Sequence, residues 1–101
     1  LTHNVKPYRT NAAYGGAKTA LCSLVKSTAA QYSSWGITCN GILPGLTETE
    51  YQSPQLLSGL AQKNPSGKII PAETIATAAI TLLSIQEVNG ALLNVDDGWT
   101  P

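Results

Sequence analysis

Tyr14 and Lys18 are the side chains of this sequence whose types and spacing could do chemistry together. Residues four apart on an α-helix lie on one face, with roughly 5–6 Å between their Cβ atoms. A cation close to a phenol favours the phenolate and lowers a pKa that is ordinarily about 10. A tyrosine placed in this way can give or take a proton near neutral pH. The alternative is that both are ordinary helix residues, because a match this short also arises by chance.

A long helix, from about Ala12 to Ser34, is predicted to carry this pair. Cap candidates at the start are offered by Arg9-Thr10-Asn11, and Gly36 is well placed just beyond the end. The face that carries the pair continues at helical spacing through Leu21, Val25, Thr28 and Tyr32. A second face of mostly small side chains could pack on another helix, within the subunit or across an interface: Ala13, Ala17, Ala20 and Leu24. We therefore expect little of this helix to be exposed.

Two strands and two further helices are predicted after the long helix. The strands are residues 37–43, bounded by Pro44-Gly45, and residues 91–95, which follow the turn at Asn89-Gly90. A short helix over about 54–63 begins at Ser53-Pro54. Another begins at Pro71, and its apolar positions follow helical spacing: Ile75, Ala76, Ala79, Leu82 and Leu83. Neither strand alternates cleanly, which is typical of parallel strands covered on both faces.

This order of elements predicts an α/β fold with a parallel sheet. Two strands cannot make a sheet that holds this many helices, so we expect the chain to be the C-terminal half of a doubly wound domain. Ligands in such domains bind beyond the carboxyl ends of the strands. Pro44-Gly45 would then lie at that edge of the sheet, and so would the loop that leads into Tyr14 if a strand precedes Leu1.

Composition excludes several other classes of function. The net charge is zero and 12% of residues are charged, so no basic patch indicates nucleic acid. No apolar run approaches a membrane span and no signal peptide is visible, so we expect a cytoplasmic protein. Cys22 and Cys39 are expected to be buried free thiols, and a single histidine, His3, leaves no cluster for a metal. The chain begins with Leu1 and has no Met, so we do not expect a complete translation product.

The order of these motifs resembles the short-chain dehydrogenase/reductase family. The resemblance runs from about Asn11 onward and rests on Tyr14-x-x-x-Lys18, then residues 40–45 (NGILPG), then Thr49, and finally residues 89–99 (NGALLNVDDGW). It implies a Rossmann-type fold, of which residues 1–101 would be the C-terminal part of one NAD(P)-binding domain. It also implies oxidation of an alcohol or reduction of a carbonyl with NAD or NADP. Homodimers or homotetramers that pack partly through the long helix would be expected.

Site residues follow from the same resemblance. Tyr14 would be the general acid/base, and Lys18 would hold the nicotinamide ribose and lower the pKa of the tyrosine. The residues of the loop that closes over the nicotinamide would be Pro44, Gly45, Leu46 and Thr47, with Thr49 contacting the same end of the cofactor. The helix over 53–63 would be the substrate-side lid.

The sequence also departs from the family pattern. The glycine-rich phosphate loop and the asparagine of the proton relay belong to an N-terminal half that this sequence does not contain. The substrate-orienting serine would fall at or before Leu1, where Thr2 is the nearest hydroxyl. Asp97 stands where a second glycine is common and is interpreted as a tolerated turn residue. A non-catalytic α/β fragment or binding module therefore stays open as the second hypothesis, and residues 1–101 alone are not expected to bind a dinucleotide.

Overall fold

The computed structural model describes residues 11–48 and 53–98, and the fold is given for these ranges. The elements follow the predicted order of helix, strand, two helices and strand. They are α1 (Ala12–Tyr32) with a 3-10 turn η1 (Ser33–Trp35), β1 (Gly41–Pro44), α2 (Pro54–Ala61), α3 (Ala72–Ser84) and β2 (Leu92–Val95).

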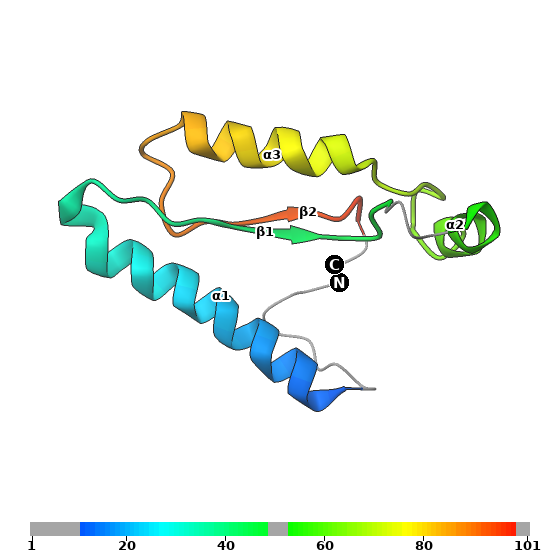
Figure 1. Ribbon diagram of the computed structural model, residues 1–101, viewed down its shortest axis with the longest axis horizontal. Helices are drawn as coiled ribbons and strands as arrows, with labels where there is room; N and C mark the ends of the chain where they lie inside the picture. The colour runs from blue at the N-terminus through cyan, green and yellow to red at the C-terminus, as the bar shows by residue number, and fades with distance from the viewer. Residues whose placement is uncertain (1–10, 49–52, 99–101) are drawn as a thin grey trace.

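The two strands form a parallel sheet, as predicted. Gly41 pairs with Leu92 and Pro44 with Val95, so the strands end at the same edge. Figure 1 shows α1 and α3 on opposite faces of this sheet and α2 beyond the carboxyl ends of the strands. The arrangement is a partial Rossmann-type α/β fold, which confirms the predicted fold class.

Local capping explains where α1 begins and where the helical run of α1 and η1 ends. The side chain of Asn11 accepts a hydrogen bond from the backbone N–H of Tyr14 at 3.0 Å, which satisfies one of the donors left open at a helix start. Helix α1 passes at Ser33 into the 3-10 turn η1, and this turn ends at Gly36, which has φ 75° and whose N–H donates to the Ser33 carbonyl. This left-handed conformation suits glycine, so both predicted caps are confirmed.

The expectation that little of α1 would be exposed is wrong. Only Cys22 and Ala29 are buried along its length, whereas Leu21 and Leu24 are 52% and 59% exposed. The predicted small-residue face (Ala13, Ala17, Ala20 and Leu24) is exposed throughout. The physical reason is the narrow sheet, since two strands cover only one side of a helix of this length. Val25, Thr28 and Tyr32 are half-buried.

The first strand begins at Gly41 and not at Ile37, which corrects the predicted start. The segment before it pairs with the segment before β2 through asparagine side chains. Asn89 Oδ1 accepts from the Cys39 N–H at 2.9 Å, while Asn40 Oδ1 accepts from the Ala91 N–H and Asn40 Nδ2 donates to the Val88 carbonyl. Side chains thus replace part of the strand ladder. Cys39, predicted to lie mid-strand and buried, lies before β1 and is half-buried.

The remaining boundaries differ from the predictions by one or two residues. Helix α2 ends at Ala61 instead of Lys63, and β2 begins at Leu92 instead of Ala91. The predicted cap of α2 is confirmed, because Ser53 Oγ accepts from the Leu56 N–H at 3.1 Å. Helix α3 begins after Pro71, and its sheet-facing residues are only half-buried. Leu83, predicted to lie on the apolar face of this helix, is 83% exposed.

The core is therefore small. Its buried apolar residues are Cys22 and Ala29 of α1, Leu43 of β1, and Ile70, which lies just before α3. These residues hold α1 and the start of α3 against the sheet. The C-terminal half of α1 is tied further by Asn89, whose Nδ2 donates to the Ala29 carbonyl at 3.2 Å.

Candidate active site

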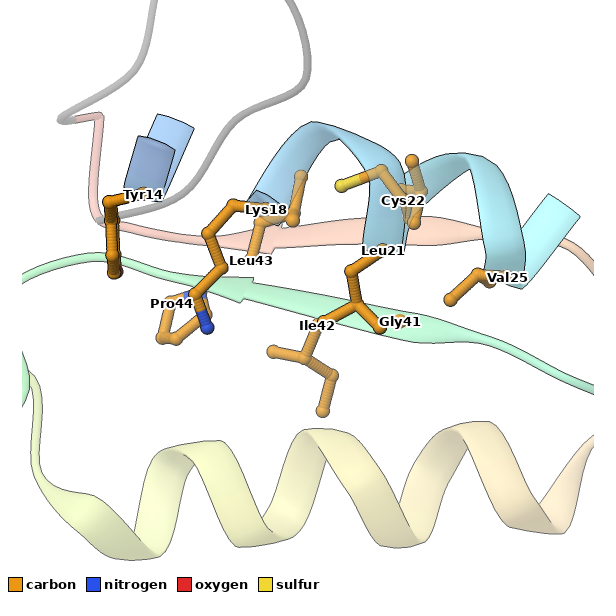
Figure 2. Close-up of a pocket in the computed structure, with 10 residues that line it drawn as sticks. Tyr14, Lys18, Leu21, Cys22, Val25, Gly41, Ile42, Leu43 and Pro44 are labelled. Atoms are coloured by element: carbon orange, nitrogen blue, oxygen red, sulfur yellow. The ribbon is translucent and has the colours of Figure 1, made fainter. Parts of the chain in front are cut away.

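A pocket of about 320 Å³ lies between α1 and β1. Tyr14 and Lys18 line one wall, and Pro44 marks the end of β1 on the other. Figure 2 shows both α1 side chains pointing toward the strand, with the Lys18 ammonium over the end near Pro44. The rest of the lining is mostly apolar: Leu21, Cys22, Val25, Gly41, Ile42, Leu43 and Leu92. The predicted catalytic pair thus opens into one concave site, where a small molecule could be held.

The pair itself has the geometry that helical spacing predicted. Tyr14 and Lys18 are both half-buried, and the Lys18 ammonium lies 5.5 Å from the centroid of the Tyr14 ring. A cation within about 6 Å of a ring centroid is attracted by the electrons of the ring. The contact places positive charge beside the phenol without removing either side chain from the pocket.

The loop that follows β1 lies at the carboxyl edge of the sheet, as predicted. We call Pro44, Gly45, Leu46 and Thr47 the 44–47 loop. Gly45 is buried and the other three residues are half-buried. The Gly45 N–H donates to the Val95 carbonyl at 3.0 Å, which extends the strand pairing by one residue beyond β1.

The far side of this loop is held by Ile70, which precedes Pro71 at the start of α3. The Ile70 N–H donates to the Leu46 carbonyl and the Glu48 N–H donates to the Ile70 carbonyl, both at 2.9 Å. Thr47 pairs with Ile70 as an isolated parallel bridge, and the Thr47 hydroxyl donates to the Gly45 carbonyl at 3.1 Å. Across the ranges that the structure describes, no hydrogen bond uses the backbone N–H of Leu46 or Thr47. These two amides remain available to a ligand.

The structure does not bring every predicted site residue together. Tyr14, Lys18 and Pro44 line the same pocket, whereas Gly45, Leu46 and Thr47 continue from its edge without lining it. Thr49 and Thr2 lie outside the described residues, and so does most of the loop predicted to lead into Tyr14. The predicted lid begins at Ser53, and its helix lies beyond the carboxyl ends of the strands (Figure 1).

Sequence reasoning placed Leu21 and Val25 on the face of the pair, but it missed the apolar floor that the two strands contribute to the pocket and the role of one glycine. Gly41 lies where a methyl group would come within 3.0 Å of Leu92 Cδ2 and 3.5 Å of Val25 Cγ2. A bare backbone at this position lets β2 and α1 approach the strand closely. The isolated glycine within a strand pattern was the available signal.

Neither a metal site nor a membrane-spanning helix occurs within the described ranges. Among those residues, His, Cys, Asp and Glu side chains nowhere gather in groups of three or more that could hold a metal ion. No described helix combines the length and apolar character needed to cross a membrane.

The chain matches a family model and many known proteins. The family model is described as enoyl-(acyl carrier protein) reductase and matches residues 2–100. A similar curated protein is the inactive 2-(S)-hydroxypropyl-CoM dehydrogenase 2 of Xanthobacter autotrophicus, 39% identical over 88% of this chain and 44% of its own. L-rhamnose-1-dehydrogenase of Scheffersomyces stipitis is 37% identical over 84% of this chain and 36% of its own. The 3beta-hydroxysteroid dehydrogenase 2 of Eggerthella lenta is 35% identical over 91% and 39%.

Solved structures show the same likeness. A doubly substituted short-chain dehydrogenase/reductase from Serratia marcescens superposes with a TM-score of 0.81 at 28% identity, over 97% of this chain and 42% of that one. A short chain dehydrogenase from Bacillus anthracis superposes with a TM-score of 0.72 at 27% identity, over 84% and 36%. The chain therefore spans less than half the length of each of these proteins.

Proposed function

Because this chain belongs to the short-chain dehydrogenase/reductase family of oxidoreductases, we propose that the protein containing it interconverts an alcohol and a carbonyl compound with NAD or NADP. The observation that carries the proposal is the shared pocket of Tyr14, Lys18 and Pro44 at the carboxyl edge of a parallel sheet. Ligands of open α/β sheets bind at that edge.

The residues present fit a nicotinamide at this edge. The pocket is mostly apolar with a few polar groups, as a flat aromatic ring requires. The free amides of Leu46 and Thr47 could donate to a carboxamide oxygen, and the Lys18 ammonium could donate to ribose hydroxyls. When bound, the nicotinamide supplies or accepts the hydride.

Tyr14 carries the proton in this proposal. In reduction its hydroxyl gives a proton to the oxygen of the substrate as negative charge develops there, and in oxidation the phenolate takes the hydroxyl proton. Lys18 places a positive charge 5.5 Å from the centroid of the Tyr14 ring, beside the phenol whose hydroxyl would exchange the proton.

The names of the relatives indicate a broad class of substrate. The names of three relatives refer to hydroxypropyl-CoM, L-rhamnose and a 3beta-hydroxysteroid, which share a hydroxyl group and little else. We therefore assign an alcohol or the corresponding carbonyl compound.

A non-catalytic protein with the same fold is the second candidate. One relative is named an inactive dehydrogenase although it is 39% identical to this chain. Likeness at this level thus extends to a protein named as lacking activity. The effect of Tyr14 on turnover distinguishes the oxidoreductase from the non-catalytic protein.

The test is Tyr14→Phe in the complete protein. The variant loses only the hydroxyl, so turnover should fall on the order of 10²- to 10⁴-fold while the affinity for the dinucleotide stays nearly unchanged. Steady-state rates over a panel of alcohols and carbonyl compounds, with fluorescence titration of the dinucleotide, give both quantities. A variant that keeps more than about a tenth of the rate would remove Tyr14 from the role of acid/base. Tyr32→Phe, half-buried on the same helix, is the matched control and should keep its rate.

A further inference from the structure

We propose that Asp96 is a positioning residue, which acts through Gly45 to set the 44–47 loop against the nicotinamide end of a bound dinucleotide. The inference rests on the proposed function, because it assigns the free loop amides to that cofactor. It concerns a residue at the end of β2, on the strand beside the one that carries the loop.

Asp96 is itself held in place. Its side chain is 8% exposed, its Oδ1 accepts from the Gly98 N–H at 3.2 Å, and its Oδ2 accepts from Asn94 Nδ2 at 3.3 Å. The turn that follows is tight, with left-handed backbone at Asp97 (φ 53°) and Gly98 (φ 83°). Aspartate tolerates this conformation better than most residues, in line with its interpretation as a turn residue. The carboxylate of Asp96 thus closes the turn over residues 96–98.

Gly45 packs directly on the backbone of this residue. A methyl group on Gly45 would lie 2.7 Å from Asp96 Cα, and 2.9 Å from both its Cβ and its carbonyl oxygen. Because two of these atoms belong to the backbone, no side-chain rotation can make room. The position of Asp96 therefore determines how far the 44–47 loop can move toward β2.

The same turn also reaches the other support of the loop. Gly98 lies near Pro65, since a methyl group on Gly98 would be 3.9 Å from Pro65 Cβ. Pro65 begins the segment that ends at Ile70, which is hydrogen-bonded to Leu46 and Glu48. The Asp96 turn thus contacts both sides of the loop, directly at Gly45 and through the 65–70 segment. Loosening the Asp96 turn should therefore misplace the amides of Leu46 and Thr47 together.

The experiment compares two ligands in the complete protein. One is the reduced dinucleotide that the protein prefers, and the other is ADP-ribose, or its 2′-phosphate for NADP, which lacks the nicotinamide. Asp96→Ala should weaken the dinucleotide about tenfold and leave the affinity for the ADP-ribose compound unchanged. Gly45→Ala should give the same split, and the double variant should lose little more, because both changes act through one contact.

Conservative variants distinguish a positioning role of Asp96 from a general loss of folded structure. Asp96→Asn keeps an acceptor for the Gly98 N–H and can re-pair with a rotated Asn94 amide, so it should restore most of the affinity for the dinucleotide. Asp97→Asn removes a charge from the neighbouring exposed residue and should change neither affinity. Thermal unfolding of each variant shows that it is folded. If Asp96→Ala does not fold, Gly45→Ala still gives the comparison of the two ligands.

Each result either supports or overturns the inference about Asp96. Equal weakening of both ligands would mean that Asp96 has a structural role only and would overturn the inference, as would no change in either. A wild-type protein that binds no dinucleotide would overturn the proposed function, and the inference with it. A wild-type protein that binds the dinucleotide, with variants that show no split, would overturn the inference alone.

Discussion

The ammonium nitrogen of Lys18 lies 5.5 Å from the centroid of the Tyr14 ring, one helical turn away along α1. Both side chains are half-buried and face the same pocket. The lysine thus contacts the ring and lines the space where a cofactor ribose would be expected, so it is in a position to affect proton transfer and cofactor binding at once.

Lys18→Met in the complete protein should lower both the turnover rate and the affinity for the dinucleotide, each by about tenfold or more. Methionine keeps much of the length of the side chain and removes only the charge and its donors. Steady-state rates and fluorescence titration measure the two effects. Lys26→Met is the matched control, because Lys26 lies exposed on the same helix and donates to the Gly90 carbonyl at 3.2 Å, away from the pocket. A Lys18→Met variant with normal affinity for the dinucleotide would contradict the role of Lys18 in cofactor binding.

Asn89→Ala should destabilise the complete protein by about 1–3 kcal/mol. The substitution leaves the part-buried N–H of Cys39 without its acceptor and the Ala29 carbonyl without its donor. Asn89→Asp keeps the acceptor for Cys39 and should lie between alanine and the wild type. Urea unfolding followed by circular dichroism measures the free energy, and an Asn89→Ala protein as stable as the wild type would show that these bonds contribute nothing net.

Ala20→Glu tests the proposal that the complete protein assembles through α1. The face of Ala13, Ala17, Ala20 and Leu24 is exposed in the described chain, and Leu24 is 59% exposed. If a second copy covers this face, a glutamate there would be a buried unpaired charge and should lower the oligomeric state. Light scattering reports the mass in solution. Ala30→Glu, the same change on another exposed side of α1, should leave the assembly intact, and an unchanged mass for Ala20→Glu would refute the proposed interface.

Residues 1–101 expressed alone should be insoluble or molten and should show no saturable binding of NAD or NADP. An isolated pair of short strands is marginal in water, and apolar strand edges promote aggregation. The exposed Leu21, Leu24 and Leu93 add apolar surface on both sides of the described sheet. Adding the rest of the protein, in cis or as a separate chain, should restore solubility and binding. A sharp cooperative thermal transition of the isolated segment would contradict this prediction.

The sequence alone determined the features that depend on neighbours a few residues apart. The cap at Asn11, the left-handed Gly36 and the cap at Ser53 each join groups within four residues, so turn and helix chemistry predicts them directly. The same holds for Tyr14 and Lys18, whose common face follows from the pitch of a helix. The parallel fold class followed from the order of the elements and the apolar character of the strands.

Only the tertiary structure decided which surfaces and strands meet. The asparagine bonds that shorten β1 join residues about fifty positions apart, and the contact between Gly45 and Asp96 spans a similar distance. No local periodicity encodes such contacts, because they depend on how two separate segments align. The exposure of α1 was decided in the same way, since an apolar face is buried only where another element covers it. The amphipathic pattern of a helix predicts which of its faces can be buried, and the neighbouring elements determine which face is buried.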